Sequence, residues 1–261
     1  MNSLCLVFAS LFFMNGLQAA EVVEIPAGQI EAIWLTPVSK KDEKKEAVPK
    51  VSVAAFKTLR HPVTVAEFRT FIDKNPQWTK AKVPRLFADK AYLNGLSSER
   101  KSEGKSPVTY VSWHAARAYC QSLNMRLPTI NEWEYMAAAS ESQRDANRNP
   151  EFLRRILDWY GEPQDGALKP VGSIYKNVYG LWDLHGLIWE WVEDFNSSFV
   201  TGESREDSSF NKNMFCGAGS MSSSDKENYA AFMRFAFRSG LSGRSAVWNL
   251  GFRCVQSGDS K

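Results

Sequence analysis

The sequence predicts a single α+β domain that is rich in loops, with a few early helices and small antiparallel sheets. Apolar residues recur at helical spacing chiefly within residues 63–73, 112–120 and 129–136. Beyond residue 175 the chain is rich in Gly, Asn and Ser, and its apolar runs are short. The chain contains no internal repeat and no proline-rich linker. We expect loops this long to be fastened by a metal or a disulfide.

Each predicted helix begins after a residue that can cap its first turn. Thr64 precedes the first helix, Ser112 the second and Thr129 the third, where Thr129 and Glu132 form a capping-box pattern. Short runs of β-branched and aromatic residues predict the strands. These strands are 22–25, 29–34 as its hairpin partner, 51–56, 171–175, 232–239 and 251–255.

The composition is that of a globular protein. The chain has 261 residues, 44% of them hydrophobic, which is enough for a full-sized core. A formal net charge of +3 is too small to indicate nucleic acid or an anionic membrane surface as a partner. Nine tryptophans predict a core and a surface cleft built on large aromatic rings.

The N-terminal segment is typical of an export signal. Residues 4–13 form the apolar run LCLVFASLFF, and small and polar residues precede Glu21. The alternative is a membrane anchor, but the run is short for a membrane span. We therefore predict a signal peptide over 1–20 and one domain over 21–261. We expect a monomer that is periplasmic or secreted and has no membrane contact after cleavage.

Removal of this signal leaves three cysteines, Cys120, Cys216 and Cys254. An oxidising compartment permits a disulfide. Three cysteines allow one bridge and one spare thiol, or no bridge at all.

Four segments carry motifs of a known family. They are VVEIPAGQ with HPVTVAEFRTFI, then PVTYVSWHAARAYCQSLNMRLPTINEWEYMAAA, then PVGSIYKNVYGLWDLHGLIWEWVEDF, and finally FRSGLSGRSAVWNLGFRCV. In this order they resemble the formylglycine-generating-enzyme, or sulfatase-modifying-factor, family. The resemblance implies one domain of the C-type-lectin-like kind over nearly the whole chain that follows the signal.

The resemblance also implies a disulfide and a metal. Cys120 and Cys254 match positions that form a disulfide in some family members, the alternative being two buried thiols. Calcium in the family is held around a Gly-Asn-x-Trp-Glu loop and an Asp-containing loop upstream. Glu190 and Asp165 are therefore the candidate calcium ligands, although Leu187 stands where Asn is usual.

The catalytic segment departs from the family pattern. Family enzymes bind copper with two cysteines that follow a Gly-Gly-Ser strand, since soft sulfur suits Cu(I). Here residues 217–220 match that strand, and Ser223 and Ala230 stand in place of the two cysteines. We expect no copper and no oxidation of cysteine to formylglycine. An altered site would be lined by Ser220, Ser222, Ser223, Cys216, Arg238 and Trp248.

Three functions stay open from the sequence. The first is an accessory or maturation factor that binds a periplasmic protein or peptide, because relatives without the cysteine pair occur beside copper nitrite reductase genes. The second is a protein-modifying oxidoreductase with an altered active site, in which Cys216 would act. His61, His114 and His185 could join it in a site, but their spacing matches no metal pattern. The third is a lectin-like module that binds sugar, which no sequence feature supports.

Overall fold

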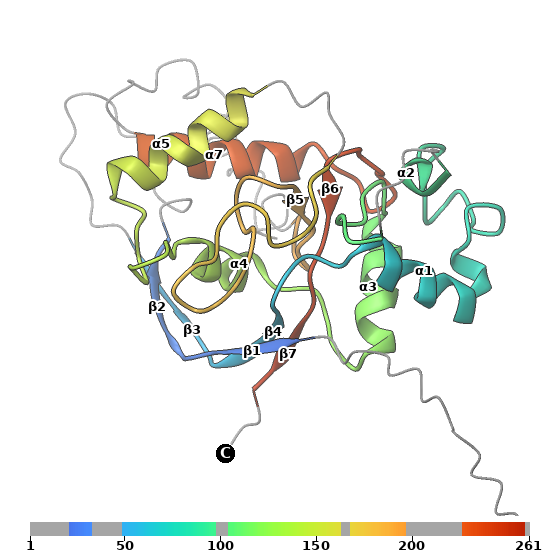
Figure 1. The fold of residues 1–261 in the computed structure, drawn as a ribbon, viewed down its shortest axis with the longest axis horizontal. Helices are drawn as coiled ribbons and strands as arrows, with labels where there is room; N and C mark the ends of the chain where they lie inside the picture. The colour runs from blue at the N-terminus through green and yellow to red at the C-terminus, as the bar shows by residue number, and fades with distance from the viewer. Residues whose placement is uncertain (1–20, 33–48, 98–103, 163–167, 197–225, 259–261) are drawn as a thin grey trace, which may run out of the picture.

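A computed structural model describes residues 21–32, 49–97, 104–162, 168–196 and 226–258 of the protein (Figure 1). The chain forms short strands and helices joined by long ordered loops. In order these elements are β1 (Val22–Ile25), β2 (Gly28–Glu31), β3 (Lys50–Val53), β4 (Phe56–Leu59), α1 (Val65–Lys74), η2 (Pro76–Trp78), α2 (Asn94–Ser97), α3 (Trp113–Ser122), α4 (Ile130–Ala137), α5 (Pro150–Gly161), β5 (Trp189–Glu190), α7 (Lys226–Ser239), β6 (Leu250–Gly251) and β7 (Val255–Ser257).

The first four strands make one bent antiparallel ribbon. β1 pairs with β4 from Val22 opposite Leu59, and β2 pairs with β3 from Gly28 opposite Val53, in the same register. Pro26 lies at the bend, where its missing N–H tolerates a break in the ladder. β7 adds to β4 on the other side and gives the order β1-β4-β7.

This ribbon corrects two strand predictions. The described part of 29–34 is not the hairpin partner of 22–25, because β1 and β2 follow each other along one arm of the ribbon, and residues 33 and 34 lie outside the described residues. Likewise 51–56 is divided between the end of β3 and the start of β4. The small antiparallel sheets are confirmed, and the two-residue pair β5 and β6 adds a parallel one.

The three predicted helices are confirmed together with their caps. The hydroxyl of Thr64 accepts from Glu67 N, and that of Thr129 accepts from Glu132 N, each within a complete capping box. Ser112 accepts from Ala115 N at the start of α3. These bonds satisfy N–H groups that the first helical turn leaves without partners.

The segment predicted as a strand at 232–239 lies instead in α7. Its apolar and basic residues resemble the alternation of a strand, yet Ala231, Arg234, Phe235 and Arg238 are buried along one helical face. The predicted strand at 171–175 is also absent from the structure. There the carboxylate of Asp183 accepts hydrogen bonds from Gly172 N and Ile174 N, in place of a strand partner.

α5 was not predicted from the sequence. Asn149 caps it and Pro150 occupies its first turn, so the polar stretch before it is a helix entry. Phe152, Ile156 and Trp159 line its buried face. The helix packs on α7, and both cover one side of the domain (Figure 1).

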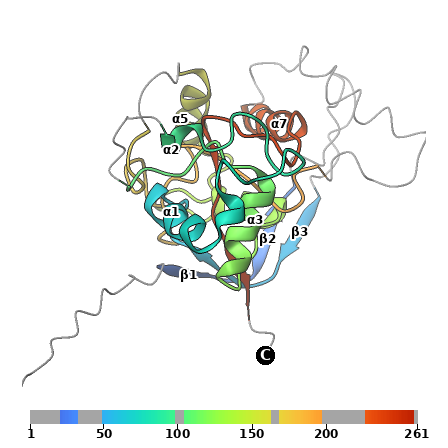
Figure 2. The same cartoon turned by 90° about the vertical axis from the view of Figure 1, so that its right-hand side faces the viewer.

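The main core lies between the ribbon, α1, α3 and α4, with the late segment that carries Leu250 and Phe252 running through it. Figure 2 shows α1 and α3 in front of the sheet strands. A smaller cluster, with Phe152, Tyr175 and Ala230, lies beneath α5. Within the described residues, no helix has the length and apolar character needed to cross a membrane.

Candidate functional site

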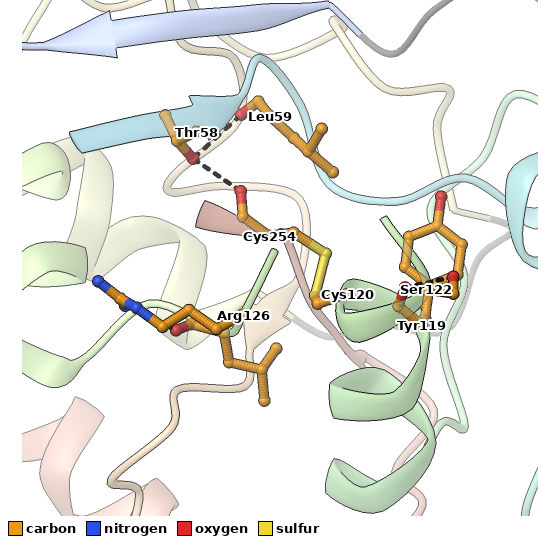
Figure 3. The surroundings of a disulfide bond; sticks show 8 residues. Thr58, Leu59, Tyr119, Cys120, Ser122, Arg126 and Cys254 are labelled. Atoms are coloured by element: carbon orange, nitrogen blue, oxygen red, sulfur yellow. Dashed lines mark hydrogen bonds between the residues drawn. A yellow bond between two sulfur atoms is a disulfide. The ribbon is translucent and has the colours of Figure 1, made fainter. Parts of the chain in front are cut away.

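The predicted disulfide is confirmed. Cys120 in α3 is bonded to Cys254 just before β7, with 5.5 Å between their Cα atoms (Figure 3). Both residues are completely buried. The Thr58 hydroxyl donates to the Cys254 carbonyl at 3.2 Å, which ties β4 to the same point. The bridge therefore fastens the end of the chain to an early helix across 134 positions of sequence.

The residues predicted to line an altered catalytic site are described only in part. Cys216, Ser220, Ser222 and Ser223 lie outside the described residues, as does Asp165. Ala230, in place of the second cysteine, is 2% exposed and packs in the cluster beneath α5. Trp248 is half-buried and Arg238 is buried. No described hydrogen bond or ring contact joins Trp248 to Arg238.

Arg238 is part of a buried ionic cluster instead. The Glu134 carboxylate in α4 accepts from Arg234 Nη2 at 2.6 Å and from Arg238 Nη1 at 2.9 Å. Burial raises the pKa of Glu134, but the two guanidinium groups outweigh it and hold that pKa below its usual value. Arg238 also lies over the Trp133 ring, 4.8 Å from its centroid. These contacts fix α7 on α4.

Glu190, a candidate calcium ligand, is engaged with a cation of the protein. Arg253 donates to both Glu190 carboxylate oxygens at 2.8 Å, and Trp133 Nε1 donates to one of them at 2.9 Å. Arg253 and Glu190 side chains are fully buried. A divalent ion beside this guanidinium would meet a like charge, so the described surroundings of Glu190 do not fit calcium.

The space beside these ion pairs is nearly filled. Aromatic rings close it. The rings of Tyr160 and Phe237 both stack on the Trp189 ring, with centroids 5.0 Å and 4.5 Å from its centroid. The remaining cavity of about 10 Å³ is the size of one water. Burial and then Arg234 lower the pKa of His185, which borders this cavity, to about 3, so the ring is neutral. Among the described residues, this cavity leaves no room for a substrate.

A different region presents apolar side chains to solvent. We call it the Leu86 surface and define it by Leu86, Phe87, Trp78 and His114. Leu86 is 75% exposed and Phe87 is 37% exposed. The Phe87 ring lies 5.1 Å from that of His114 and 6.2 Å from that of Trp78. Burial and then Arg117 lower the pKa of His114, which favours its neutral ring.

The loop that carries this surface is held firmly from below. Asp89 Oδ2 accepts from Ala246 N at 3.0 Å, and Asp89 N donates to the Arg244 carbonyl at 2.9 Å. The buried Tyr92 donates its hydroxyl proton to the Trp78 carbonyl at 3.0 Å. The exposed apolar groups therefore stand on a fixed frame rather than at a loose loop tip.

The loop that carries the Leu86 surface is basic. Its exposed cations are Lys80, Lys82, Arg85 and Lys90, and the exposed Arg244 is joined to it by the backbone hydrogen bond to Asp89. Asp89 is the single acidic residue in 79–97, and its carboxylate is occupied by backbone N–H groups. The combination of an apolar centre and a basic rim suits an apolar group flanked by carboxylates.

Sequence reasoning missed Glu134, Arg234 and the Leu86 surface. Glu134 lies within the helix pattern of α4, and its burial could be inferred only from the two arginines that reach it from α7. The run of four cations around Leu86 in 80–90 was a usable signal. Among the described residues no group of three or more His, Cys, Asp and Glu is placed to hold a metal.

The chain is similar to known proteins over most of its length. The sequence matches one family model, the sulfatase-modifying factor enzyme 1-like domain, over residues 9–258. The formylglycine-generating enzyme of Bos taurus is 28% identical over 90% of this chain and 74% of its own length. The inactive C-alpha-formylglycine-generating enzyme 2 of Bos taurus is 28% identical over 92% of this chain and 89% of its own. The crystal structure of CarF has a TM-score of 0.48 and 15% sequence identity, covering 92% of this chain and 99% of CarF.

Proposed function

Because the chain belongs to the sulfatase-modifying factor family, we propose that it is an exported accessory or maturation factor. In this proposal it binds a protein or peptide partner with the Leu86 surface and does not make formylglycine. A periplasmic copper nitrite reductase is the first partner to test, on the resemblance described above. Export is supported by the Cys120–Cys254 disulfide, since such bonds persist in oxidising compartments.

The number of available thiols supports the loss of copper chemistry. The chain has four cysteines, of which Cys5 lies in the expected signal and two form the bridge. Cys216 is then the remaining thiol. A linear Cu(I) site needs two thiolates, and serine or alanine at 223 and 230 supplies neither. A Bos taurus relative described as inactive is 28% identical over 92% of this chain, so the relatives of this chain include one without the enzymatic activity.

The observation that carries the binding role is the fixed, exposed Leu86 surface with its basic rim. The Leu86 side chain is 75% exposed on a well-held loop, so it contributes little to the free energy of folding. Covering it with a partner would remove that area from water, and the surrounding cations would attract a partner with carboxylates. We infer that the partner presents an apolar side chain between acidic residues.

Thiol and oxidase assays test the first half of the proposal. Protein purified from the periplasm should take up one alkylating group per chain before reduction and three after it. Oxygen uptake with a cysteine-containing peptide and added copper should equal the protein-free blank. Conversion of the peptide cysteine to formylglycine, detected by mass spectrometry, would overturn the proposal.

A labelled peptide tests the second half. The probe is a fluorescent peptide with a Phe-Leu core flanked by Asp and Glu, compared with the same core flanked by Lys. Fluorescence anisotropy should show saturable binding of the acidic peptide alone, weakened at least tenfold by Leu86→Ala. The charge reversal Arg85→Glu should weaken binding of the acidic peptide more at low salt than at high salt. Equal binding of both peptides, or no effect of Leu86→Ala, would refute this surface as the docking site.

A further inference from the structure

A cavity near the ribbon lies between β2 and α4, away from the Leu86 surface. We call it the tyrosine pocket. Its volume is about 170 Å³, far more than one water needs and below the roughly 300 Å³ of the smallest drug-sized sites. β2 lies at the opposite end of the molecule from α1 and the loop after it (Figure 1). The lining residues are Gln29, Ile30, Tyr135, Ala138, Arg144, Asp145 and Tyr179.

The walls of the tyrosine pocket are two tyrosines held in place by their surroundings. Tyr135 and Tyr179 have ring centroids 6.0 Å apart. The Tyr135 hydroxyl lies against Gly28 of β2, where a Cβ would be 2.3 Å away, so a side chain at 28 would displace it. Tyr179 N donates to the side chain of the buried Asn177 at 3.1 Å, which fixes the second wall.

The base of the pocket is apolar and equally fixed. Ile30 is 3% exposed within β2, and Ala138 is 3% exposed at the end of α4. The Ala138 carbonyl accepts from Ala146 N at 2.7 Å, which brings the loop with Arg144 and Asp145 to the pocket mouth. A site of this kind needs little rearrangement to accept an apolar group.

The mouth carries charges of both signs. Arg144 lies over the Tyr179 ring, 5.9 Å from its centroid. Asp145 uses Oδ1 to accept from Asn147 N at 3.1 Å. Neither residue has an ion-pair partner within the part of the chain that the structure describes. A guanidinium binds carboxylate and a carboxylate binds ammonium, so adjacent groups of both signs complement a zwitterion.

From this arrangement we propose that the tyrosine pocket binds a free α-amino acid with an apolar or aromatic side chain. Arg144 binds its carboxylate and Asp145 its ammonium group. The side chain lies against the edges of the two tyrosine rings, above Ile30 and Ala138. This site is separate from the Leu86 surface and does not depend on the function proposed for it.

Isothermal titration calorimetry of the full chain tests the pocket with L-phenylalanine and L-leucine. The probe N-acetyl-L-phenylalanine amide has the same side chain without either charge. We expect saturable one-to-one binding of the free amino acids, at least tenfold weaker in Arg144→Gln and in Asp145→Asn, and none of the capped amide. The control Arg154→Gln removes an exposed arginine from α5 and should leave the affinity unchanged.

Three outcomes would overturn this inference. They are the absence of saturable binding, equal affinity for the capped amide, and binding of D-glucose with no binding of amino acids. None of them bears on peptide binding at the Leu86 surface. Conversely, if Leu86→Ala lost peptide binding but still bound amino acids, the result would support two separate sites.

Discussion

The interior around Glu134 and the Leu86 surface contain the same kinds of side chain with opposite exposure. Both combine cations with aromatic rings. In the interior, Arg234 and Arg238 share the Glu134 carboxylate, and both side chains are buried. In the loop 79–97 of the Leu86 surface the single carboxylate, that of Asp89, is taken by backbone groups, and the lysines and Arg85 face solvent. An arginine is therefore structural where the fold provides it with a free carboxylate, and it is available to a partner molecule where the fold does not.

The strongest way to test this comparison is Glu134→Gln. Glutamine keeps the volume but leaves two buried guanidinium groups without a counter-charge, so we expect a loss of about 3–5 kcal/mol in the free energy of unfolding. Urea denaturation measures it. The matched control is Glu141→Gln, which removes the exposed partner of Arg155 and should cost less than about 1 kcal/mol. Equal losses in the two variants would contradict the distinction between the regions.

The disulfide gives the next largest effect. Replacing both partners, Cys120→Ser with Cys254→Ser, should lower the free energy of unfolding by about 2–5 kcal/mol, because the bridge restricts the unfolded chain. Chemical denaturation of oxidised and reduced wild type provides the control, since reduction should reproduce the loss. The double variant lacks this bridge, so a reducing agent should not destabilise it. Destabilisation of the double variant would show that a disulfide other than Cys120–Cys254 contributes to stability.

The pH dependence of stability separates the interior from the surface again. Burial lowers the pKa of His185 to about 3, whereas the unfolded value is about 6.5. Below pH 6.5 the unfolded chain binds a proton that the folded chain excludes. The free energy of unfolding therefore decreases as the pH is lowered from about 6.5 to about 3. The expected loss is roughly 2 kcal/mol at pH 5.

Comparison with His185→Gln measures this contribution. Glutamine retains an N–H donor for the Ala137 carbonyl that His185 Nε2 contacts at 3.0 Å. The difference in unfolding free energy between wild type and variant should shrink as pH falls from 7 to 5. His114 is present in both proteins and cancels from the difference. A constant difference over this range would mean that His185 is not buried in its neutral form.

Local signals explain what could be predicted from the sequence. Thr64, Ser112 and Thr129 cap their helices with bonds to residues three positions away, so the pattern is visible in the chain itself. The Cys120–Cys254 pair was predicted through family resemblance, because three cysteines alone allow several outcomes. The family and its fold followed from motif order.

Long-range partners explain what could not be predicted. α7 resembled a strand because arginines on its buried face broke the apolar helical pattern, and their partner Glu134 is 100 positions earlier. The bend at Pro26 depends on the ribbon partners of the flanking residues, Phe56 for Ile25 and Val53 for Gly28, which are distant in sequence. The candidate calcium ligand Glu190 is paired with Arg253, a contact that spacing along the chain does not reveal.

The smallest expected effect on stability is at the Leu86 surface. Leu86→Ala removes a side chain that is 75% exposed, so the free energy of unfolding should change by less than about 0.5 kcal/mol. The same truncation at Leu184, which is 1% exposed beside the sealed interior, should cost about 2–5 kcal/mol. Urea denaturation of the two variants in parallel measures both. A large loss in Leu86→Ala would mean that this side chain supports the fold, and its use as a docking surface would then lose its physical basis.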